Sequence, residues 1–349
     1  MALAGTSGGA TEGASSAGAP VGLWPLTFYF LRLGALGFGG VALVGMMHRD
    51  LVERRRLVAE PEFKFAVALA QIMPGPLAAQ VAIALGYFQT GLVGAIAAGL
   101  AFVLPSFVIV VGLAALYVAY GGLWWVQALS YSIAAAVVAI IAVAAYRLAR
   151  ATNKRDPLMW GIFAGLLVVT AWVRAELAEF FIMAGLLVLV VRARPRWLDI
   201  RLPFLALPAG SLVLSTAPMV VQVAPDALVQ MGLFFAKAGA FVFGSGLAIV
   251  PFLYQGVVQQ FGWLSEQQFL DAVAIAMITP GPVLITVAFI GYLVAGLPGA
   301  AVSAFAIFSP VYFLTILPAP WLRRHRDNAQ LKAFVDGATA AATGAIAGA

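Results

Sequence analysis

The sequence predicts an all-α polytopic membrane protein built as an inverted-topology repeat, with broken or re-entrant helices at two Pro-Gly-Pro motifs. Three observations predict this fold class: the composition, the recurring apolar runs and an internal similarity between two halves. Of the 349 residues, 63% are hydrophobic and 10% are charged, whereas soluble domains carry about 25% charged residues. The composition therefore indicates a chain that meets lipid rather than water.

Several apolar runs approach the ~20 residues that a helix needs to cross a bilayer. They include residues 128–145, 158–173 and, shorter, 180–191. A transmembrane β-barrel would instead show short segments of alternating hydrophobicity, which this sequence lacks. We therefore expect a multi-pass helical protein of the cytoplasmic (inner) membrane, in contact with membrane lipid.

The residue inventory excludes several kinds of site. The chain has no cysteine, so it has no disulfide, thiolate or iron–sulfur site. His48 and His325 both lie beside arginines in polar segments without ligand partners nearby, so we expect no metal. No phosphate-binding G-x-x-x-x-G-K-[ST] motif occurs, so ATP is not the energy source within this chain. We expect no cofactor, and we do not expect an enzyme.

The basic residues of the chain cluster in short segments beside apolar runs. The net charge of +6 could suggest binding to nucleic acid, but this placement is the positive-inside signal of membrane proteins. Nucleic acid is therefore not an expected partner. Residues 1–23 are mostly Gly, Ala, Ser and Thr without a basic start or an apolar core, which predicts a disordered tail rather than a signal peptide.

In the remainder of the chain, the N-terminal half resembles the C-terminal half. A shift of 205 residues aligns Arg32 with Lys237 and Pro105 with Pro310, and a shift of 206 aligns the motif at Pro74 with that at Pro280. So many Gly, Pro and basic positions do not align in order by chance. We expect a first repeat at 24–150, connecting transmembrane segments at 151–227 and a second repeat at 228–349.

Charge predicts how the two repeats are oriented. The segment "HRDLVERRR" at 48–56 is strongly basic, whereas its counterpart at 254–269 contains no Lys or Arg and one acid, Glu266. By the positive-inside bias the first segment is cytoplasmic and the second lies outside. Equivalent segments on opposite sides indicate an inverted repeat, as in many secondary transporters.

The Pro-Gly-Pro motifs predict hairpins. Expected cytoplasmic segments at 48–64 and 147–155 flank three apolar segments, and an even number of crossings leaves one of them re-entrant. Proline removes a backbone donor and glycine permits a reversal, so 65–88 is expected to enter, turn and return. One kinked crossing helix is the alternative. Polar side chains would lie near the two tips: Gln71, Gln80, Thr279 and Thr286.

Glycine runs at 37–40 and 244–246 predict two further helix breaks, because glycine destabilises helix interiors. Whether 23–47 crosses the membrane or doubles back stays open at this point. The C-terminus matches the start of the 126–146 run at the same offset, so the chain ends within an expected final helix, with Asp336 near its start.

Arg32 and Lys237 are cations inside apolar stretches. Such a charge costs about 2.5–3.5 kcal/mol on insertion scales. Two of them at equivalent repeat positions indicate an anion site, together with exposed amides at broken helix ends. The alternative is that each side chain extends along its helix to the lipid headgroups.

Several motifs together resemble the chromate ion transporter family. They are "FGG…HRDLVERRR", "QIMPGPLAAQVAIALGY", "FVLPSF" and "FVFGSGLAIVPFL…GWLSEQQFLDAVAIAMITPGPV", and the resemblance runs from Phe28 to the C-terminus. It implies export of chromate, with sulfate as an analogue or competitor. The family positions fall on Arg32, Phe38, Gly39, Gly40, Pro74, Gly75, Pro76, Gln80, Lys237, Phe243, Gly244, Pro280, Gly281 and Pro282. We add Gln71, Ser245 and Thr279 as candidate substrate-binding residues, Ser245 where the second run reads Gly-Ser-Gly.

The leading functional interpretation is a secondary active transporter for a tetrahedral dianion, chromate or sulfate. Membrane acids are few, namely Asp271 and Asp336, which favours anion exchange or drive by the membrane potential over proton coupling. An anion channel, a transporter of another oxyanion such as sulfate, and a scaffold that transports nothing are the alternatives. A chromate reductase would need a redox centre that the sequence lacks. The oligomeric state stays open, with a homodimer as one alternative.

Overall fold

The computed structural model describes residues 22–38, 40–120, 155–173, 178–192, 227–241 and 249–325, with single positions in 143–153 and 330–344. Most of these residues are helical, and none of the described residues forms a β-strand, which confirms the all-α prediction. Two helical stretches, Leu77–Tyr120 and Val283–Leu322, are long and apolar enough to cross a membrane. The predicted helix at 128–145 lies outside the described residues.

The described part of the first half contains five helical elements. They are α1 (Leu23–Leu36), α2 (Gly40–Met47), η1 (His48–Arg54), α3 (Glu60–Ile72) and α4 (Leu77–Tyr120). Gly37 stops α1, because its backbone is extended (φ −90°, ψ 132°). The predicted break in the first glycine run is therefore confirmed, and 23–47 is two helices rather than one.

Two apolar helices follow and pack together: α6 (Pro157–Val173) and α7 (Ala178–Arg192). They correspond to the apolar runs that the sequence predicted at 158–173 and 180–191. An ion pair between Asp156 and Arg192 joins the start of α6 to the end of α7. Their shared core includes Ala333 and Ala340 from the C-terminal part of the chain, separate from the main core.

The described part of the second half parallels that of the first in the order of its elements. They are α8 (Ala227–Phe241), α9 (Val250–Tyr254), η4 (Gln255–Gln260), α10 (Glu266–Ile278), η5 (Val283–Ile285), α11 (Thr286–Ile316) and α12 (Ala319–His325), with η5 and α12 as additions. The second glycine run, 244–246, lies outside the described residues, so the structure does not test the break predicted there.

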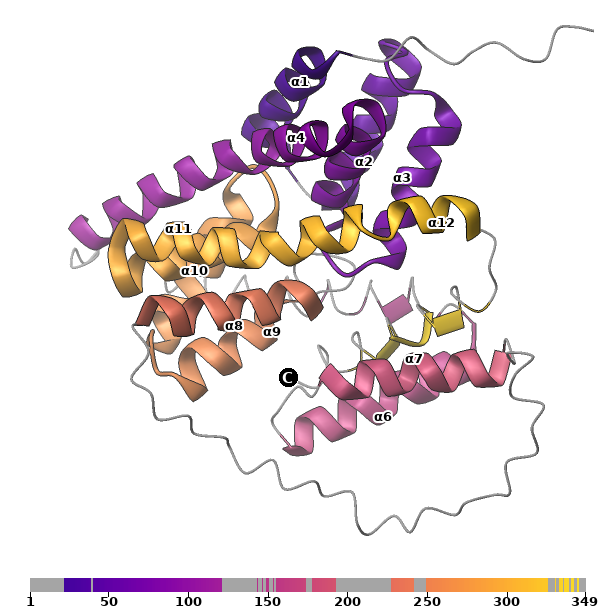
Figure 1. Ribbon diagram of the computed structural model, residues 1–349. Coiled ribbons are helices and arrows are strands. Elements are labelled where there is room, and N and C mark those ends of the chain that lie inside the picture. Colours follow the sequence, from indigo (N-terminus) through magenta and orange to yellow (C-terminus); the bar gives the residue numbers. More distant parts are fainter. Residues whose placement is uncertain are drawn as a thin grey trace, which may run out of the picture.

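The main core is built around α4 and α11, which pack side by side, with α1 against α4 and α8 against α11 (Figure 1). Glycines let α1 approach α4 closely and let α8 approach α11 closely. A Cβ at Gly34 would collide with the carbonyl oxygen of Phe102, and a Cβ at Gly239 would collide with that of Ile307. Small residues let apolar helices approach this closely in lipid.

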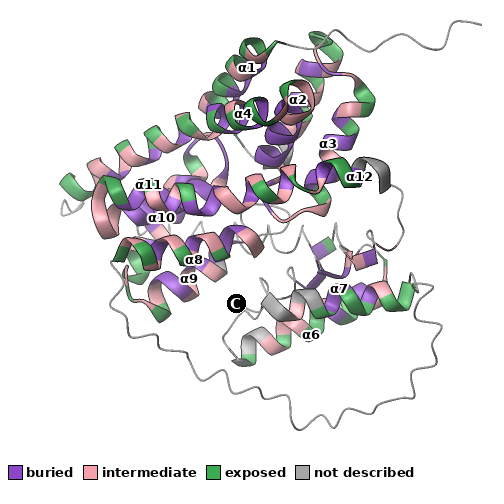
Figure 2. Cartoon of the chain, in the orientation of Figure 1, coloured by how far each residue is buried: buried purple, intermediate pink, exposed green. Residues whose placement is uncertain are grey.

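Both long helices are interrupted by a sharp turn near their start. Gly91 has φ +68° and Gly296 has φ +63°, a conformation that side chains other than glycine rarely adopt. Each long helix therefore consists of a short limb, residues 77–89 or 286–294, and a longer limb. The longer limbs expose large apolar side chains such as Leu100 and Phe305 (Figure 2), as expected of surfaces that contact lipid.

The close helix contacts give a test of stability. We expect Gly34→Ala and Gly239→Ala each to lower the free energy of unfolding by about 1–3 kcal/mol, the usual effect of overpacking. Gly112→Ala is the matched control, because Gly112 lies on exposed α4 with open space around it, and it should stabilise by up to about 1 kcal/mol. Thermal unfolding of the purified variants measures this. Equal behaviour of all three variants would contradict the glycine contacts.

Candidate functional site

The first Pro-Gly-Pro motif forms the tip of a helical hairpin. α3 ends at Ile72 and α4 begins at Leu77. The far ends of the two limbs meet, because Gln89 Nε2 donates to Glu62 Oε2 at 2.9 Å and the rings of Phe65 and Phe88 stack at 5.3 Å. The chain therefore reverses at the motif, and 65–88 is not one continuous helix.

Gln80 holds the first tip in place. Its Nε2 donates to the carbonyl oxygens of Pro74 at 2.7 Å and of Met73 at 3.3 Å. The tip fits beneath it because Gly75, at φ +141°, has no side chain; a Cβ there would lie 2.7 Å from Gln80 Cδ. The side chain of Gln80 is fully buried, and its Oε1 has no hydrogen-bond partner among the described residues.

The second tip docks onto the first half of the protein. The N–H of Gly281 donates to the carbonyl oxygen of Gly37 at 2.8 Å, at the break that follows α1. A Cβ at Gly281 would collide with Ser106 Oγ, and this hydroxyl donates to the carbonyl oxygen of Gly34 at 3.3 Å. We call this contact between Gly34, Gly37, Ser106 and Gly281 the junction. It brings two interrupted backbones together, and only a glycine fits at position 281.

Ser106 is a junction residue that the sequence prediction missed. It is fully buried in α4 directly after Pro105, within the "FVLPSF" motif that carried the family resemblance. That motif was the one available signal, but a serine in an apolar helix has no obvious partner until the fold brings Gly34 and Gly281 beside it.

Hydroxyl groups and backbone N–H groups lie near the two tips. Hydroxyls of Thr279 and Thr286 are buried near the second tip, and they donate to the carbonyl oxygens of Ile275 and Val283. α4 begins at the first tip with no acid in its first turn, and the N–H groups of a helix start favour negative charge. No cluster of three metal-ligating side chains occurs among the described residues.

The structure does not bring the two predicted cations to the junction. Arg32 and Lys237 are exposed on α1 and α8, on the same faces as the exposed apolar side chains of Phe28 and Leu233. Neither cation pairs with an acid in the described part of the chain. Each lies two residues before the glycine that contacts the long helix, Gly34 or Gly239.

The other predicted site residues divide into three groups. Pro76 is buried, and Pro74, Pro280 and Pro282 complete the turns at the tips. Gln71 and Phe38 are exposed, so they do not line the junction. Gly40 begins α2, whereas Gly39, Phe243, Gly244 and Ser245 lie outside the described residues.

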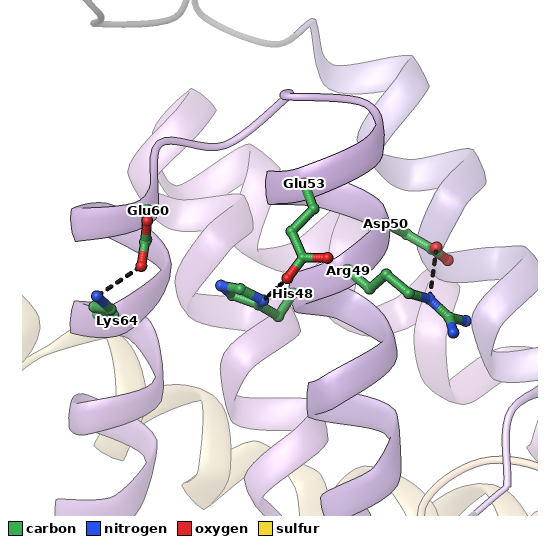
Figure 3. A network of polar contacts seen from close by, with 6 residues as sticks. All are labelled: His48, Arg49, Asp50, Glu53, Glu60 and Lys64. Carbon is green, nitrogen blue, oxygen red and sulfur yellow. Dashed lines mark ion pairs between the residues drawn. The ribbon is translucent and has the colours of Figure 1, made fainter.

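A charged segment follows α2 (Figure 3). His48 pairs with Glu53 at 3.1 Å, Arg49 with Asp50 at 3.8 Å and Lys64 with Glu60 at 2.6 Å. The hydrogen bond and charge of Lys64 lower the pKa of the Glu60 carboxyl below its usual value. These pairs leave a surplus of arginine at the end of η1, on one surface of the protein.

The counterpart of the charged segment in the second half, at 254–269, has matching backbone hydrogen bonds but lacks the basic side chains. Leu57 N–H donates to the Leu51 carbonyl oxygen at 2.7 Å, and Trp263 N–H donates to that of Val257 at 2.8 Å. In the first half the Arg55 guanidinium lies 5.7 Å from the centre of the Tyr29 ring. In the second half, Phe261 packs edge-on against Phe234 at 5.4 Å. The two segments therefore share geometry and differ in charge.

Comparison with known proteins gives one consistent family. The chromate transporter family matches residues 24–191 and 229–349. A chromate transport protein of Cupriavidus metallidurans is 55% identical over 93% of this chain and 80% of its own length. A probable chromate transport protein of Synechococcus elongatus is 55% identical over 93% and 82%, and a chromate transport protein of Pseudomonas aeruginosa is 31% identical over 97% and 82%. No solved structure matches the chain.

The junction gives a local test. In Gly281→Ala the new methyl group collides with Ser106, so the bond from residue 281 to Gly37 should be lost. We expect amide hydrogen exchange in residues 279–285 to become about tenfold faster, the factor that corresponds to about 1.4 kcal/mol. Gly262→Ala is the control, because Gly262 also has positive φ (+60°) but open space around it. Unchanged exchange in Gly281→Ala would disprove the docking.

Proposed function

This chain belongs to the chromate transporter family, and we propose that it exports chromate across the cytoplasmic membrane as a secondary active transporter. The relatives named as chromate transport proteins support chromate as the substrate. The observation that carries the proposal is the junction at which Gly281 bonds to Gly37. Two interrupted backbones meet there, which is the way transporters form substrate sites.

We propose that the two halves are an inverted repeat, at 24–150 and 228–349. Local features that recur 205 or 206 residues apart support a repeat: the close contacts of Gly34 and Gly239, the turns at Gly91 and Gly296, and the tips at Gly75 and Gly281. The difference in charge between 48–56 and its counterpart supports opposite orientations.

The lengths of the hairpins support a re-entrant position. α3 and α10 have 13 residues each, which corresponds to about 20 Å of helix, too short for a hydrocarbon core of about 30 Å. A hairpin of that length reaches beyond the middle of the bilayer and returns. Irregular backbone at such depth is tolerated where protein or a water-filled cavity surrounds it, and the tip of Gly281 is buried against Gly34, Gly37 and Ser106.

Each polar group at the junction has a role in this proposal. Backbone N–H groups and the hydroxyls of Ser106 and Thr279 hold the oxygens of a tetrahedral dianion, after small changes in their present hydrogen bonds. Arg32 and Lys237 attract the dianion by charge from α1 and α8. Because both side chains are exposed and lie outside the junction, they act on the dianion through their charge and not through direct contact. Sulfate has the same shape and charge, so we expect it to compete.

The membrane potential favours the proposed direction. Moving one charge across about 100 mV is worth about 2.3 kcal/mol, so a dianion that leaves a negative interior gains about 4.6 kcal/mol. Export therefore needs no ATP, in accord with the lack of an ATP-binding motif in the sequence.

Uptake of labelled chromate into inside-out vesicles tests both the function and the cations. We expect uptake by the wild type, competition by sulfate and, in Arg32→Gln, an apparent affinity weaker by up to about fivefold, since an exposed charge that acts without direct contact contributes about 1 kcal/mol or less. Arg32→Lys should retain the wild-type affinity because it keeps the charge. Lys237→Arg should be tolerated better than Lys237→Gln.

Lys64→Gln is the control, because Lys64 is an exposed cation paired with Glu60 at the start of α3, and it should retain wild-type affinity. Apparent affinity is measured per folded molecule, so that poor insertion is not mistaken for weak binding. Wild-type affinity in both Arg32→Gln and Lys237→Gln would overturn the role of the cations. Absence of chromate uptake by the wild type would overturn the proposed function.

A further inference from the structure

Asp271 is a buried carboxylate that the proposed anion site does not use. Its side chain lies in α10 and is 3% exposed. Oδ2 accepts a hydrogen bond from the Tyr117 hydroxyl at 2.7 Å, and Oδ1 accepts one from Gln267 Nε2 at 3.0 Å. Tyr117 belongs to α4 of the first half and packs edge-on against Phe289 at 5.5 Å. The carboxylate is therefore held at the contact between the two halves.

Among the described residues of the elements that pack most closely against α10, no cation balances this carboxylate. α4, η5, α9, η4 and α11 pack against α10, and their described residues include no Asp, Glu, Lys, Arg or His. Their titratable side chains are tyrosines, of which Tyr117 bonds to Asp271 and Tyr254 lies near Glu266. Glu266 itself is exposed at the start of α10. A buried charge without a partner of opposite sign is costly, and within membrane proteins such residues mark functional sites.

The repeat does not account for the carboxylate. The position 206 residues before Asp271 is Phe65, whose ring stacks on Phe88. An apolar side chain therefore fills the equivalent place in the first hairpin. The first hairpin therefore forms without a carboxylate at this point, so the repeated backbone does not itself require one.

Asp271 lies close enough to the junction to influence an anion there. Seven residues separate it from Ile278, the last residue of α10, which corresponds to about 10 Å along the helix. The tip that bonds to Gly37 follows directly. In an apolar interior a negative charge at such a distance repels a dianion with little screening by water or salt. Binding of one proton to Asp271 removes this repulsion.

We propose that Asp271 is a proton-binding site linked to the anion: it takes up one proton when a dianion binds at the junction and releases it when the dianion leaves. The inference rests on the proposed function. The proton comes from solution and converts the carboxylate into a neutral carboxylic acid, while the dianion is unchanged. The complex then carries one negative charge less than the dianion brings. Because linkage is reciprocal, the affinity for the dianion rises as pH falls.

Titration calorimetry of the purified chain in lipid nanodiscs measures this linkage. Chromate is titrated at a pH where the free ion is the dianion, in two buffers of different ionisation enthalpy, so that the heats report the protons bound per anion. We expect an uptake approaching about one proton in the wild type, with affinity falling by up to about tenfold per pH unit. In Asp271→Asn we expect no proton uptake and an affinity that does not change with pH.

Two further variants make the result specific. Glu266→Gln removes an exposed carboxylate from the same helix and should behave as the wild type. Tyr117→Phe removes a donor that favours the charged carboxylate, so Asp271 should bind its proton more readily before the anion arrives. The pH range over which the affinity falls should then lie higher than in the wild type.

The outcomes separate the inference from the function on which it rests. Chromate binding by Asp271→Asn with wild-type proton uptake would overturn the inference alone. Absence of chromate binding by the wild type would overturn the proposed function and the inference with it. If Asp271→Asn does not fold, Tyr117→Phe decides: a pH dependence of the affinity equal to that of the wild type would overturn the role of Asp271.

Discussion

One hydrogen bond between two glycines joins the broken backbones of the two halves. Gly281 donates to Gly37, and each of these residues lies where a helix has ended. Backbone groups freed from a helix must find partners when water is excluded, and here the second half supplies a donor for the first. The remaining features of the junction follow from this contact. Ser106 packs where a side chain on residue 281 would otherwise lie, and Gly34 accepts from it.

The two halves share a backbone plan and differ in the side chains that carry charge. Glycine turns and close contacts recur at nearly constant spacing, and α3 and α10 have equal lengths. The exceptions are polar. Arg55 stands where Phe261 stands in the second half, and Asp271 stands where Phe65 stands in the first. In the proposed inverted repeat, the shared geometry lets the two halves enclose one site. The unequal charges set the orientation of the protein in the membrane. The proposed export, orientation and proton linkage all depend on these differences.

Features that depend on local backbone chemistry could be predicted from the sequence. The helix break at Gly37 and the reversal at Pro74–Pro76 follow from what glycine and proline permit, and the structure confirms both. Features that depend on distant contacts could not. Ser106, Gly37 and Gly281 are far apart in the chain, and no pattern indicated that they touch. The bond between Tyr117 and Asp271 spans 154 residues. Periodicity also gave no indication that Arg32 lies on an exposed face, because a helix that meets lipid can be apolar all round.

The proposed transport path requires the two halves to have opposite orientations in the membrane, which site-specific labelling measures directly. The chain has no cysteine, so Arg55→Cys and Gln259→Cys each introduce a single thiol, at an exposed position of the charged segment or of its uncharged counterpart. We predict that a reagent that cannot cross the membrane labels Arg55→Cys from the cytoplasmic side alone and Gln259→Cys from the opposite side alone. Labelling of both variants from the same side would contradict the inverted arrangement.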